Sequence, residues 1–118
     1  VVEGDTHDIG KNLVRIMLEA AGFEMYDLGR DVCLQSFIDK AKEVDANIIC
    51  LSTLMTTTMP GMKTVVDLLE QEKMHDKVKV MIGGGPISQA YCDKIKADGY
   101  STNAIEAVHL AKRLVGIA

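Results

Sequence analysis

The sequence has 118 residues, of which 47% are hydrophobic and only 4% aromatic, and its formal net charge is -4 at pH 7. This length suits one domain with a single core, and without any basic run a nucleic-acid-binding surface is not expected. No apolar run approaches the roughly 18 residues of a membrane span, and no signal segment opens the sequence, so no membrane association is expected.

The chain begins with the apolar pair Val1-Val2, which is short for a strand of the usual 5 or 6 residues. It also begins without Met, so we expect a piece of a longer chain that lacks the start of its first strand. A helix is then predicted from Ile9 to Ala21, where apolar residues recur at helical spacing, with Gly22 as its left-handed cap. A second strand is predicted from Phe23 to Leu28.

The rest of the chain alternates helices with strands. Helices are predicted at 34–44, at 61–72, from the cap Ser88 to about Lys96 and at 103–114, and strands at 47–51, 78–82 and 99–101. The continuous apolar run 47–51 is typical of a central parallel strand covered on both faces. The whole pattern predicts one α/β domain over 1–118, a doubly wound, flavodoxin-like (Rossmann-like) sheet of five parallel strands in the order 2-1-3-4-5.

Three unusual loops, 4–10, 52–59 and 83–86, follow the predicted strands one, three and four. In this order the first and third strands flank the topological switch point, and the fourth lies beside the third. All three loops are therefore expected to open onto one ligand-binding crevice.

The run Gly83-Gly84-Gly85 first suggests a phosphate-binding loop. No Lys-Ser or Lys-Thr follows it, and Gly4 and Gly10 do not form a Gly-x-Gly-x-x-Gly motif, so a nucleotide triphosphate site is not favoured. A tight turn explains part of the run, but glycine also lets a bulky group lie directly on the backbone. With Ser52 at the neighbouring strand end, the glycines predict a slot lined by small residues between strands three and four.

One histidine, His7, stands in the loop after the first strand. If Asp5 or Asp8 caps the helix, His7 is an ordinary polar loop residue. Alternatively His7 is a metal ligand, and Asp5 accepts the proton of its other ring nitrogen. The spacing alone does not decide between these interpretations. The other histidines, His75 and His109, are expected at the surface.

The cysteines Cys33, Cys50 and Cys92 are odd in number and far apart, with no Cys-x-x-Cys pair. Neither a disulfide framework nor a structural zinc site is predicted from such spacing. We therefore expect a reducing compartment, the cytoplasm.

Three motifs occur in register: Asp5-x-His7-x-x-Gly10, then 41 residues, Ser52-x-Leu54, then 28 residues, Gly83-Gly84. Over nearly the whole chain this pattern resembles the signature of the cobalamin-binding domain family. The wider context, 4–12 and 81–88, resembles the corrinoid proteins of anaerobic methyltransferase systems, which carry methyl groups from methylamines, methanol or methoxy-aromatics.

The resemblance implies a methyl carrier of anaerobic one-carbon metabolism that catalyses little by itself. Its cofactor would be a cobamide, either cobalamin or a related corrinoid with a different lower base, and the cobalt would accept the methyl group. A substrate-specific methyltransferase would load the cobalt, a second methyl-accepting methyltransferase would unload it, and a reductive activating protein is a further expected partner. The alternatives are the domain of an adenosylcobalamin-dependent mutase and a cobalamin sensor. The helical bundle that precedes this domain in relatives is absent from the sequence.

The family's residue roles transfer by resemblance. His7 would be the lower axial ligand of cobalt in place of the cofactor's own base, the base-off/His-on arrangement. Asp5 would hydrogen-bond the imidazole, and Thr58 would extend the pair into a proton relay. The displaced nucleotide tail would lie in the slot. The cofactor-binding positions implied are Asp5, Thr6, His7, Asp8, Ile9, Gly10, Ser52, Leu54, Thr56, Gly83, Gly84, Gly85, Tyr100 and Ala104. Lys96 stands where relatives often have Gly.

Overall fold

The computed structural model describes residues 1, 4, 9–29, 31–53 and 56–116. The elements in chain order are α1 (Ile9–Ala20), α2 (Leu34–Val44), β1 (Ile48–Ser52), the 3₁₀ helix η1 (Thr56–Thr58), α3 (Pro60–Gln71), β2 (Lys79–Gly83), α4 (Gln89–Ile95), β3 (Gly99–Tyr100) and α5 (Ala104–Leu114). All five predicted helices are confirmed, with ends that differ by a residue or two. No helix in the described part of the chain has the length and hydrophobicity needed to cross a bilayer.

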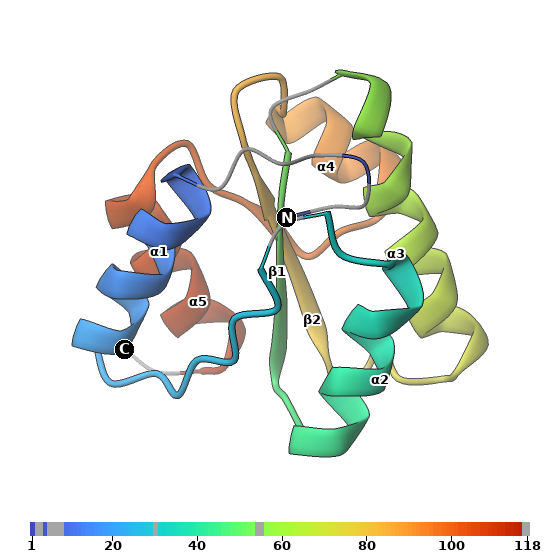
Figure 1. Ribbon diagram of the computed structural model, residues 1–118, viewed down its shortest axis with the longest axis horizontal. Coiled ribbons are helices and arrows are strands. Elements are labelled where there is room, and N and C mark those ends of the chain that lie inside the picture. Colours follow the sequence, from blue (N-terminus) through green and yellow to red (C-terminus); the bar gives the residue numbers. More distant parts are fainter. Residues whose placement is uncertain (2–3, 5–8, 30, 54–55, 117–118) are drawn as a thin grey trace.

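The described strands form one parallel sheet in the order β1-β2-β3. They correspond to the predicted strands three, four and five. Figure 1 shows the sheet edge-on, with α1 and α5 on one face and α2, α3 and α4 on the other. Helices on both faces of a parallel sheet confirm the predicted α/β class.

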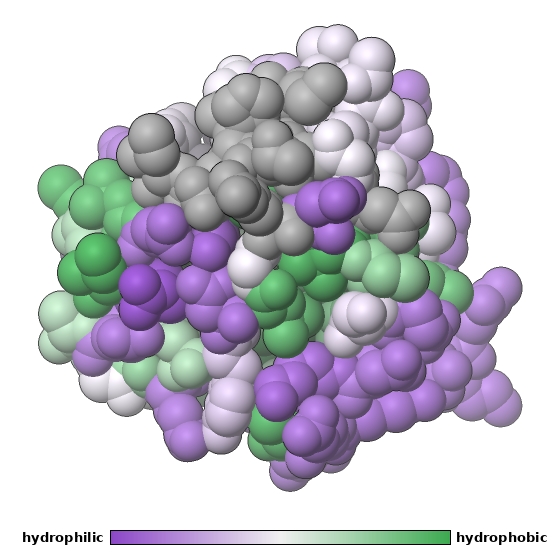
Figure 2. All heavy atoms as spheres, viewed as in Figure 1, coloured by the Kyte–Doolittle hydropathy of each residue, from purple (hydrophilic) through white to green (hydrophobic). Residues whose placement is uncertain are grey.

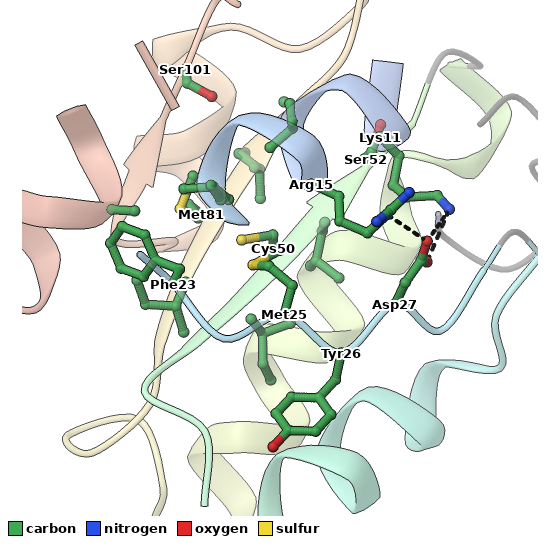
Figure 3. Close-up of a pocket in the computed structure, with 18 of the residues that line it drawn as sticks. Lys11, Arg15, Phe23, Met25, Tyr26, Asp27, Cys50, Ser52, Met81 and Ser101 are labelled. Atoms are coloured by element: carbon green, nitrogen blue, oxygen red, sulfur yellow. Dashed lines mark hydrogen bonds and ion pairs between the residues drawn. The ribbon is translucent and has the colours of Figure 1, made fainter. Parts of the chain in front are cut away.

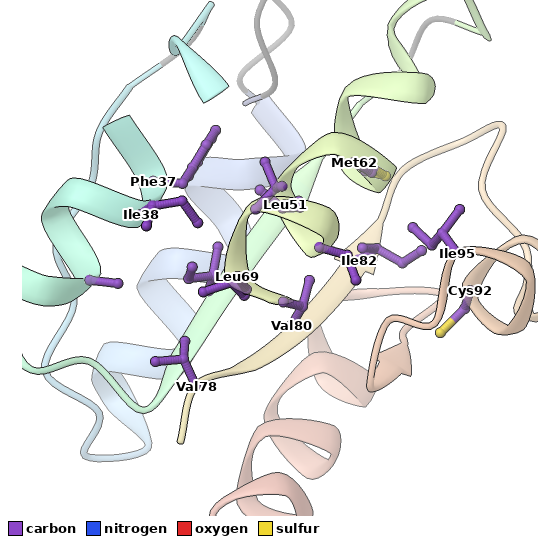
Figure 4. Packing of buried hydrophobic residues seen from close by; sticks show 14 of the residues in the cluster. Phe37, Ile38, Leu51, Met62, Leu69, Val78, Val80, Ile82, Cys92 and Ile95 are labelled. Carbon is purple, nitrogen blue, oxygen red and sulfur yellow. The ribbon is translucent and has the colours of Figure 1, made fainter. Parts of the chain in front are cut away.

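The larger hydrophobic core lies between the sheet and the layer of α2, α3 and α4 (Figure 4). Ile38 of α2, Met62 and Leu69 of α3, and Val80 of β2 are all 0% exposed. Apolar residues at helical spacing point from α2 and α3 onto alternate residues of the strands, which explains why these segments form helices here. This face of the sheet is therefore closed by close packing.

The opposite face has a smaller core, made by Leu18, Met81, Ala107, Leu110 and Ala111. Hydrophobic side chains also appear on the outside of this layer, over α1 and α5 at the left of Figure 2. Leu13 and Ile16 of α1 are 53% and 54% exposed, and Ile105 of α5 is 59% exposed. The layer of α1 and α5 is thus less completely packed than the opposite layer.

The strand predicted at 23–28 is not formed. These residues have no regular secondary structure, and the described sheet contains no pairing with them. A strand needs a hydrogen-bonded neighbour, and in the predicted order the neighbour is the first strand, of which only Val1 is described. Val1 does pair with this region: its amino group donates to the Gly29 carbonyl at 2.9 Å, and its carbonyl accepts from the Val32 N–H at 3.0 Å.

The C-terminal end of α4 is closed by Lys96, which takes the left-handed conformation with φ 63° and ψ 33°. Its N–H bonds to the carbonyls of Cys92 and Asp93. The turn therefore forms with lysine at a position where glycine would be less strained.

The prediction that His75 is a simple surface residue is wrong, whereas His109 is exposed as expected. The His75 side chain is 15% exposed, its Nδ1 contacts the Glu70 carboxylate, and its Nε2 lies 2.9 Å from Oδ2 of Asp98. The same Asp98 oxygen accepts from the Val80 N–H at 2.8 Å. This cluster ties the loop before β2 to the loop before β3.

We expect His75→Gln to lower the free energy of unfolding by about 1 kcal/mol at pH 5.5 and by less at pH 8.5. Partial burial acts to lower the pKa of His75, but Glu70 and Asp98 outweigh it, so the pKa lies above its ordinary value. A raised folded-state pKa stabilises the protein fully below the unfolded pKa of about 6.5, and this contribution is lost as the pH rises through the folded pKa. Urea unfolding of both proteins at the two pH values checks this, with His109→Gln as control. An equal loss of unfolding free energy at both pH values would contradict this prediction.

Candidate functional site

The loops that follow β1 and β2 meet at the carboxyl edge of the sheet. Ser52 and Gly83 form the last pair of the ladder, and the Thr53 N–H donates to the Gly83 carbonyl at 3.2 Å. Gly84 has a φ of +130°, and a Cβ on it would lie 1.8 Å from the Thr53 carbonyl oxygen. Only glycine allows both this conformation and this close approach, so Gly84 is needed by the backbone itself.

Gly83 has a different role. A Cβ there would lie 3.4 Å from the Ser101 carbonyl oxygen, an ordinary contact distance, and the residue has no positive φ. Because side chains alternate along a strand, position 83 faces the same side as Met81, which packs toward α1 and α5. The missing side chain at Gly83 therefore leaves open space on the α1/α5 face.

A pocket of about 980 Å³ occupies that face (Figure 3). Among the sequence-predicted positions that the structure describes, those that line it are Ser52, Gly83, Gly84, Gly85, Tyr100 and Ala104. Thr56 is exposed on η1 and is not among the lining residues. The structure thus brings together most of the predicted slot residues that it describes, from the carboxyl ends of three strands and the segments that follow them.

The interior of the pocket was not predicted from the sequence. We expected a slot between two strands, whereas the pocket lies between the face of the sheet and the layer of α1 and α5 and extends past the edge of β1 to Phe37 and Ala41 of α2. Val14 and Leu18 of α1, Met81 of β2 and Ala111 of α5 line it. Such residues at helical spacing look like ordinary core. The available signal was the pair of alanines on one face of α5, Ala104 and Ala111, whose side chains are too short to fill the space.

Most of the predicted metal-binding loop lies outside the described residues, including Asp5, Thr6, His7 and Asp8. Leu54 also lies outside them. Ile9 and Gly10 form the first turn of α1.

The start of that loop is described and lies beside Thr58. The Gly4 N–H donates to Oδ1 of Asp31 at 2.7 Å, and a Cβ on Gly4 would lie 3.1 Å from Cγ2 of Thr58. The Thr58 hydroxyl in turn contacts the hydroxyl of the fully buried Thr53. The loop therefore begins next to the end of η1, in contact with a side chain that is itself anchored to the β1 loop.

Charged residues bound the pocket where α1 faces segment 23–29 (Figure 3). Lys11 lies 2.9 Å from both carboxylate oxygens of Asp27, and Arg15 Nε lies 3.2 Å from one of them. Partial burial acts to raise the pKa of Asp27, but hydrogen bonds from Lys11 and the Gly29 N–H, with the nearby Arg15 charge, hold it below its ordinary value. Asp27 is thus ionised and holds the segment against α1.

We expect the Cys50 thiol to be alkylated about 10³-fold more slowly in the folded chain than in the unfolded chain at pH 8. Cys50 is an exposed residue whose side chain faces the pocket near Met25, and desolvation by the pocket walls raises its pKa to about 12. Because only the thiolate attacks, little reactive form is present at pH 8. Iodoacetamide labelling of a Cys33→Ser variant with and without urea, followed by peptide mass spectrometry, checks this. Similar rates in both conditions would contradict it.

Comparisons with known proteins agree on one family. The model of the B12 binding domain matches residues 1–109. Dimethylamine corrinoid protein 3 of Methanosarcina mazei is 60% identical over 114 residues, which are 97% of this chain and 68% of that protein.

Two solved structures share the fold. A cobalamin-binding protein from Desulfitobacterium hafniense DCB-2 superposes with a TM-score of 0.94 at 46% identity, covering 98% of this chain and 57% of that one. The methanol:cobalamin methyltransferase complex MtaBC from Methanosarcina barkeri gives a TM-score of 0.90 at 34% identity, covering 98% of this chain and 44% of the matched chain. The chain therefore spans between about half and two thirds of the length of these proteins.

Proposed function

This chain belongs to the B12-binding domain family, and on this basis we propose that it binds a cobamide and serves as the methyl-carrying corrinoid subunit of a methyltransferase system. The single observation that carries the proposal is the pocket between β1 and α1, which Ser52 and Gly83 help to line. When bound, the cobamide supplies a cobalt atom that accepts a methyl group from one protein and releases it to another.

The described residues fit the displaced nucleotide tail of such a cofactor. The pocket volume of about 980 Å³ lies at the upper end of the roughly 300 to 1,000 Å³ usual for cofactor sites. Its mouth is lined by Gly83 and by the hydroxyls of Ser52 and Ser101, and its interior by apolar side chains such as Leu18 and Met81. A flat aromatic base would gain from burial against these apolar side chains, and the serine hydroxyls could hydrogen-bond its sugar and phosphate.

His7 is the proposed lower ligand of cobalt, because neutral imidazole is a good nitrogen donor for this metal. Asp5 would accept a hydrogen bond from the N–H of the other ring nitrogen and so set the tautomer and orientation of the ring. Thr58 is the proposed next member of the relay, and its methyl group lies beside Gly4, the residue that directly precedes Asp5 in the chain. A proton gained by this relay weakens the imidazole as a ligand, and a proton lost strengthens it.

We expect Asp5→Asn to change the rate of methyl transfer by about 10-fold or more while leaving cobalamin bound. Asparagine keeps the shape of the side chain but cannot take up the imidazole proton. Single-turnover methyl transfer and equilibrium cobalamin binding, measured on the same preparations, check this. A loss of binding as large as the loss of rate would contradict the assignment.

The proposed partners are two methyltransferases, one that loads the cobalt and one that unloads it, together with a reductive activating protein. The relative in the methanol:cobalamin methyltransferase complex supports the first of these partners. The high identity to a dimethylamine corrinoid protein makes methylamines the first donors to test. The cysteines Cys33, Cys50 and Cys92 are all free thiols, which suits a reaction in the reducing cytoplasm.

The proposal is tested with the cobalamin-loaded chain, a reductant and a dimethylamine-specific methyltransferase. We expect the visible spectrum of the bound cofactor to change when dimethylamine is added, and to return when a methyl-accepting methyltransferase and its thiol substrate follow. A chain that binds cobalamin but is not methylated by methylamine-, methanol- or methoxy-aromatic-specific methyltransferases would contradict the carrier role.

A further inference from the structure

The turn between segment 23–29 and α2 lies alongside the first residues of the chain. The Val1 amino group donates to the Gly29 carbonyl at 2.9 Å, and the Val1 carbonyl accepts from the Val32 N–H at 3.0 Å. Figure 1 shows the segment before α2 passing beside the N-terminus. Backbone hydrogen bonds therefore hold this turn next to the beginning of the chain.

The carboxylate of Asp31, in this turn, binds the backbone of the predicted ligand loop. The Gly4 N–H donates to Oδ1 of Asp31 at 2.7 Å. Hydrogen bonds that backbone N–H groups donate to carboxylates are shorter and stronger than those to neutral acceptors, and this distance lies in their range. Gly4 has a φ of +90°, a conformation that glycine adopts without strain. The residue directly before Asp5 is therefore anchored by a side chain from a distant part of the sequence.

The backbone of Asp31 has an uncommon conformation that no helix end explains. In the described part of the chain, the non-glycine residues with positive φ are Asp31, Asp45, Lys73 and Lys96. The last three each follow a helix, and each of their N–H groups bonds back to that helix. Asp31, with a φ of 51°, follows no described helix and lies before α2. A strained residue persists where its surroundings hold it, and the interaction described for Asp31 is the bond to Gly4.

Gly4 also contacts the 3₁₀ helix η1. A Cβ at Gly4 would lie 3.1 Å from Cγ2 of Thr58, which is closer than ordinary van der Waals contact. The Thr58 hydroxyl contacts the hydroxyl of the fully buried Thr53. Two segments therefore hold Gly4 in place, the turn before α2 and η1.

The position of Gly4 matters because His7 follows it by only three residues, which span at most about 11 Å when fully extended. A metal ligand has to be placed to within about 0.5 Å of its productive position. Over so short a connection, a movement of Gly4 on the order of 1 Å is enough to exceed this tolerance.

We propose that Asp31 is a positioning residue for the cobalt ligand, an inference that rests on the function proposed above. Its carboxylate holds Gly4, and Gly4 sets where the loop that carries His7 begins. Asp31 is not among the residues that line the pocket, so it acts on the bond between His7 and cobalt and not on the nucleotide tail. Loss of this carboxylate weakens histidine coordination while the cobamide stays bound.

The test compares Asp31→Gly with Asp31→Asn. Glycine keeps the left-handed backbone but removes the acceptor, whereas asparagine keeps both. Lys73→Gly is the matched control, because it relieves the same kind of backbone strain after α3 and leaves the partner of Gly4 unchanged.

The first readout needs no cofactor. Hydrogen exchange of the Gly4 amide is followed by NMR in the unloaded chain. We expect exchange about tenfold faster in Asp31→Gly than in the unchanged protein, because the amide loses its acceptor. The Asp31→Asn and Lys73→Gly proteins should resemble the unchanged protein.

The second readout is the ease with which free imidazole displaces the histidine from cobalt. The cobalamin-loaded chain, labelled with ¹⁵N in its histidines and reduced by one electron, is titrated with unlabelled imidazole. Displacement changes the nitrogen splitting in electron paramagnetic resonance from doublets to triplets. We expect half-displacement of histidine in Asp31→Gly at an imidazole concentration about tenfold lower, which corresponds to one hydrogen bond. Asp31→Asn and Lys73→Gly should stay within about twofold of the unchanged protein, and cobalamin affinity should change less than about threefold throughout.

Half-displacement at the same imidazole concentration in Asp31→Gly and in the unchanged protein would overturn the assignment of Asp31. Equal exchange of the Gly4 amide in these two proteins would overturn it as well. An Asp31→Asn protein as weakened as Asp31→Gly would do the same, since the hydrogen-bond acceptor would not be the cause. An unchanged protein with no splitting from labelled histidine would instead refute the proposed function, and the role of Asp31 with it.

Discussion

Replacing Gly83 by valine is expected to weaken cobalamin binding about 100-fold, roughly 2.7 kcal/mol, while the chain stays folded. The added side chain would project into the pocket that the proposal assigns to the displaced base. The backbone tolerates the change because Gly83 has no positive φ, and a Cβ would lie 3.4 Å from its nearest neighbour, the Ser101 carbonyl oxygen.

Equilibrium titration with cobalamin measures this effect, and thermal unfolding shows whether the variant is folded. Lys79→Val is the matched control, because it adds the same side chain to the other end of β2, away from the pocket. Gly84→Ala should instead destabilise the fold itself, since its Cβ would lie 1.8 Å from the Thr53 carbonyl oxygen. A folded Gly83→Val protein that binds cobalamin as tightly as the Lys79→Val control would contradict the assignment of the pocket.

Replacing His7 by alanine is expected to change the visible spectrum of the bound cofactor while cobalamin affinity falls by less than about tenfold, which is 1.4 kcal/mol. With the nucleotide tail in the pocket as proposed, its contacts and most of the binding energy would remain, whereas water would replace the imidazole at the cobalt. The two effects separate because the ligand and the pocket lie on different parts of the chain.

Absorption spectra and equilibrium dialysis on the same samples check this prediction. His109→Ala is the control, because His109 is an exposed histidine on α5. A His7→Ala spectrum identical to that of the unchanged protein would contradict the role of His7 as ligand. A complete loss of cobalamin would show that the pocket contributes less than proposed.

The fold could be predicted from the sequence wherever local pattern and packing agree. The apolar spacing over 34–44 predicted α2 at its observed bounds, and the continuous run at 47–51 predicted β1 within one residue. The prediction of a strand at 23–28 was wrong for a physical reason. The residue pattern suits a strand, but a strand also needs a hydrogen-bonded neighbour, which the local sequence does not supply. Strand formation is a property of pairs, whereas helix formation is mostly local.

The candidate site, too, could be predicted only where the local sequence carries the signal. Ser52 and Gly83 could be predicted because small residues at strand ends in this fold mark a binding crevice. Leu18 and Ala111 could not, because apolar helical residues have the same pattern whether they close a core or line a pocket. His75 was misjudged because its partners Glu70 and Asp98 come together only through the fold.

The central claim is that His7 holds the cobalt while the cofactor's own base lies in the pocket. The most direct measurement is electron paramagnetic resonance of the cobalamin-loaded chain after one-electron reduction, with histidine labelled by ¹⁵N and the cofactor left unlabelled. The account predicts that the nitrogen splitting changes from triplets to doublets on labelling, and that this change is lost in His7→Ala. A splitting that stays the same on labelling would mean that the cofactor's own base remains bound to cobalt, and the account would be wrong.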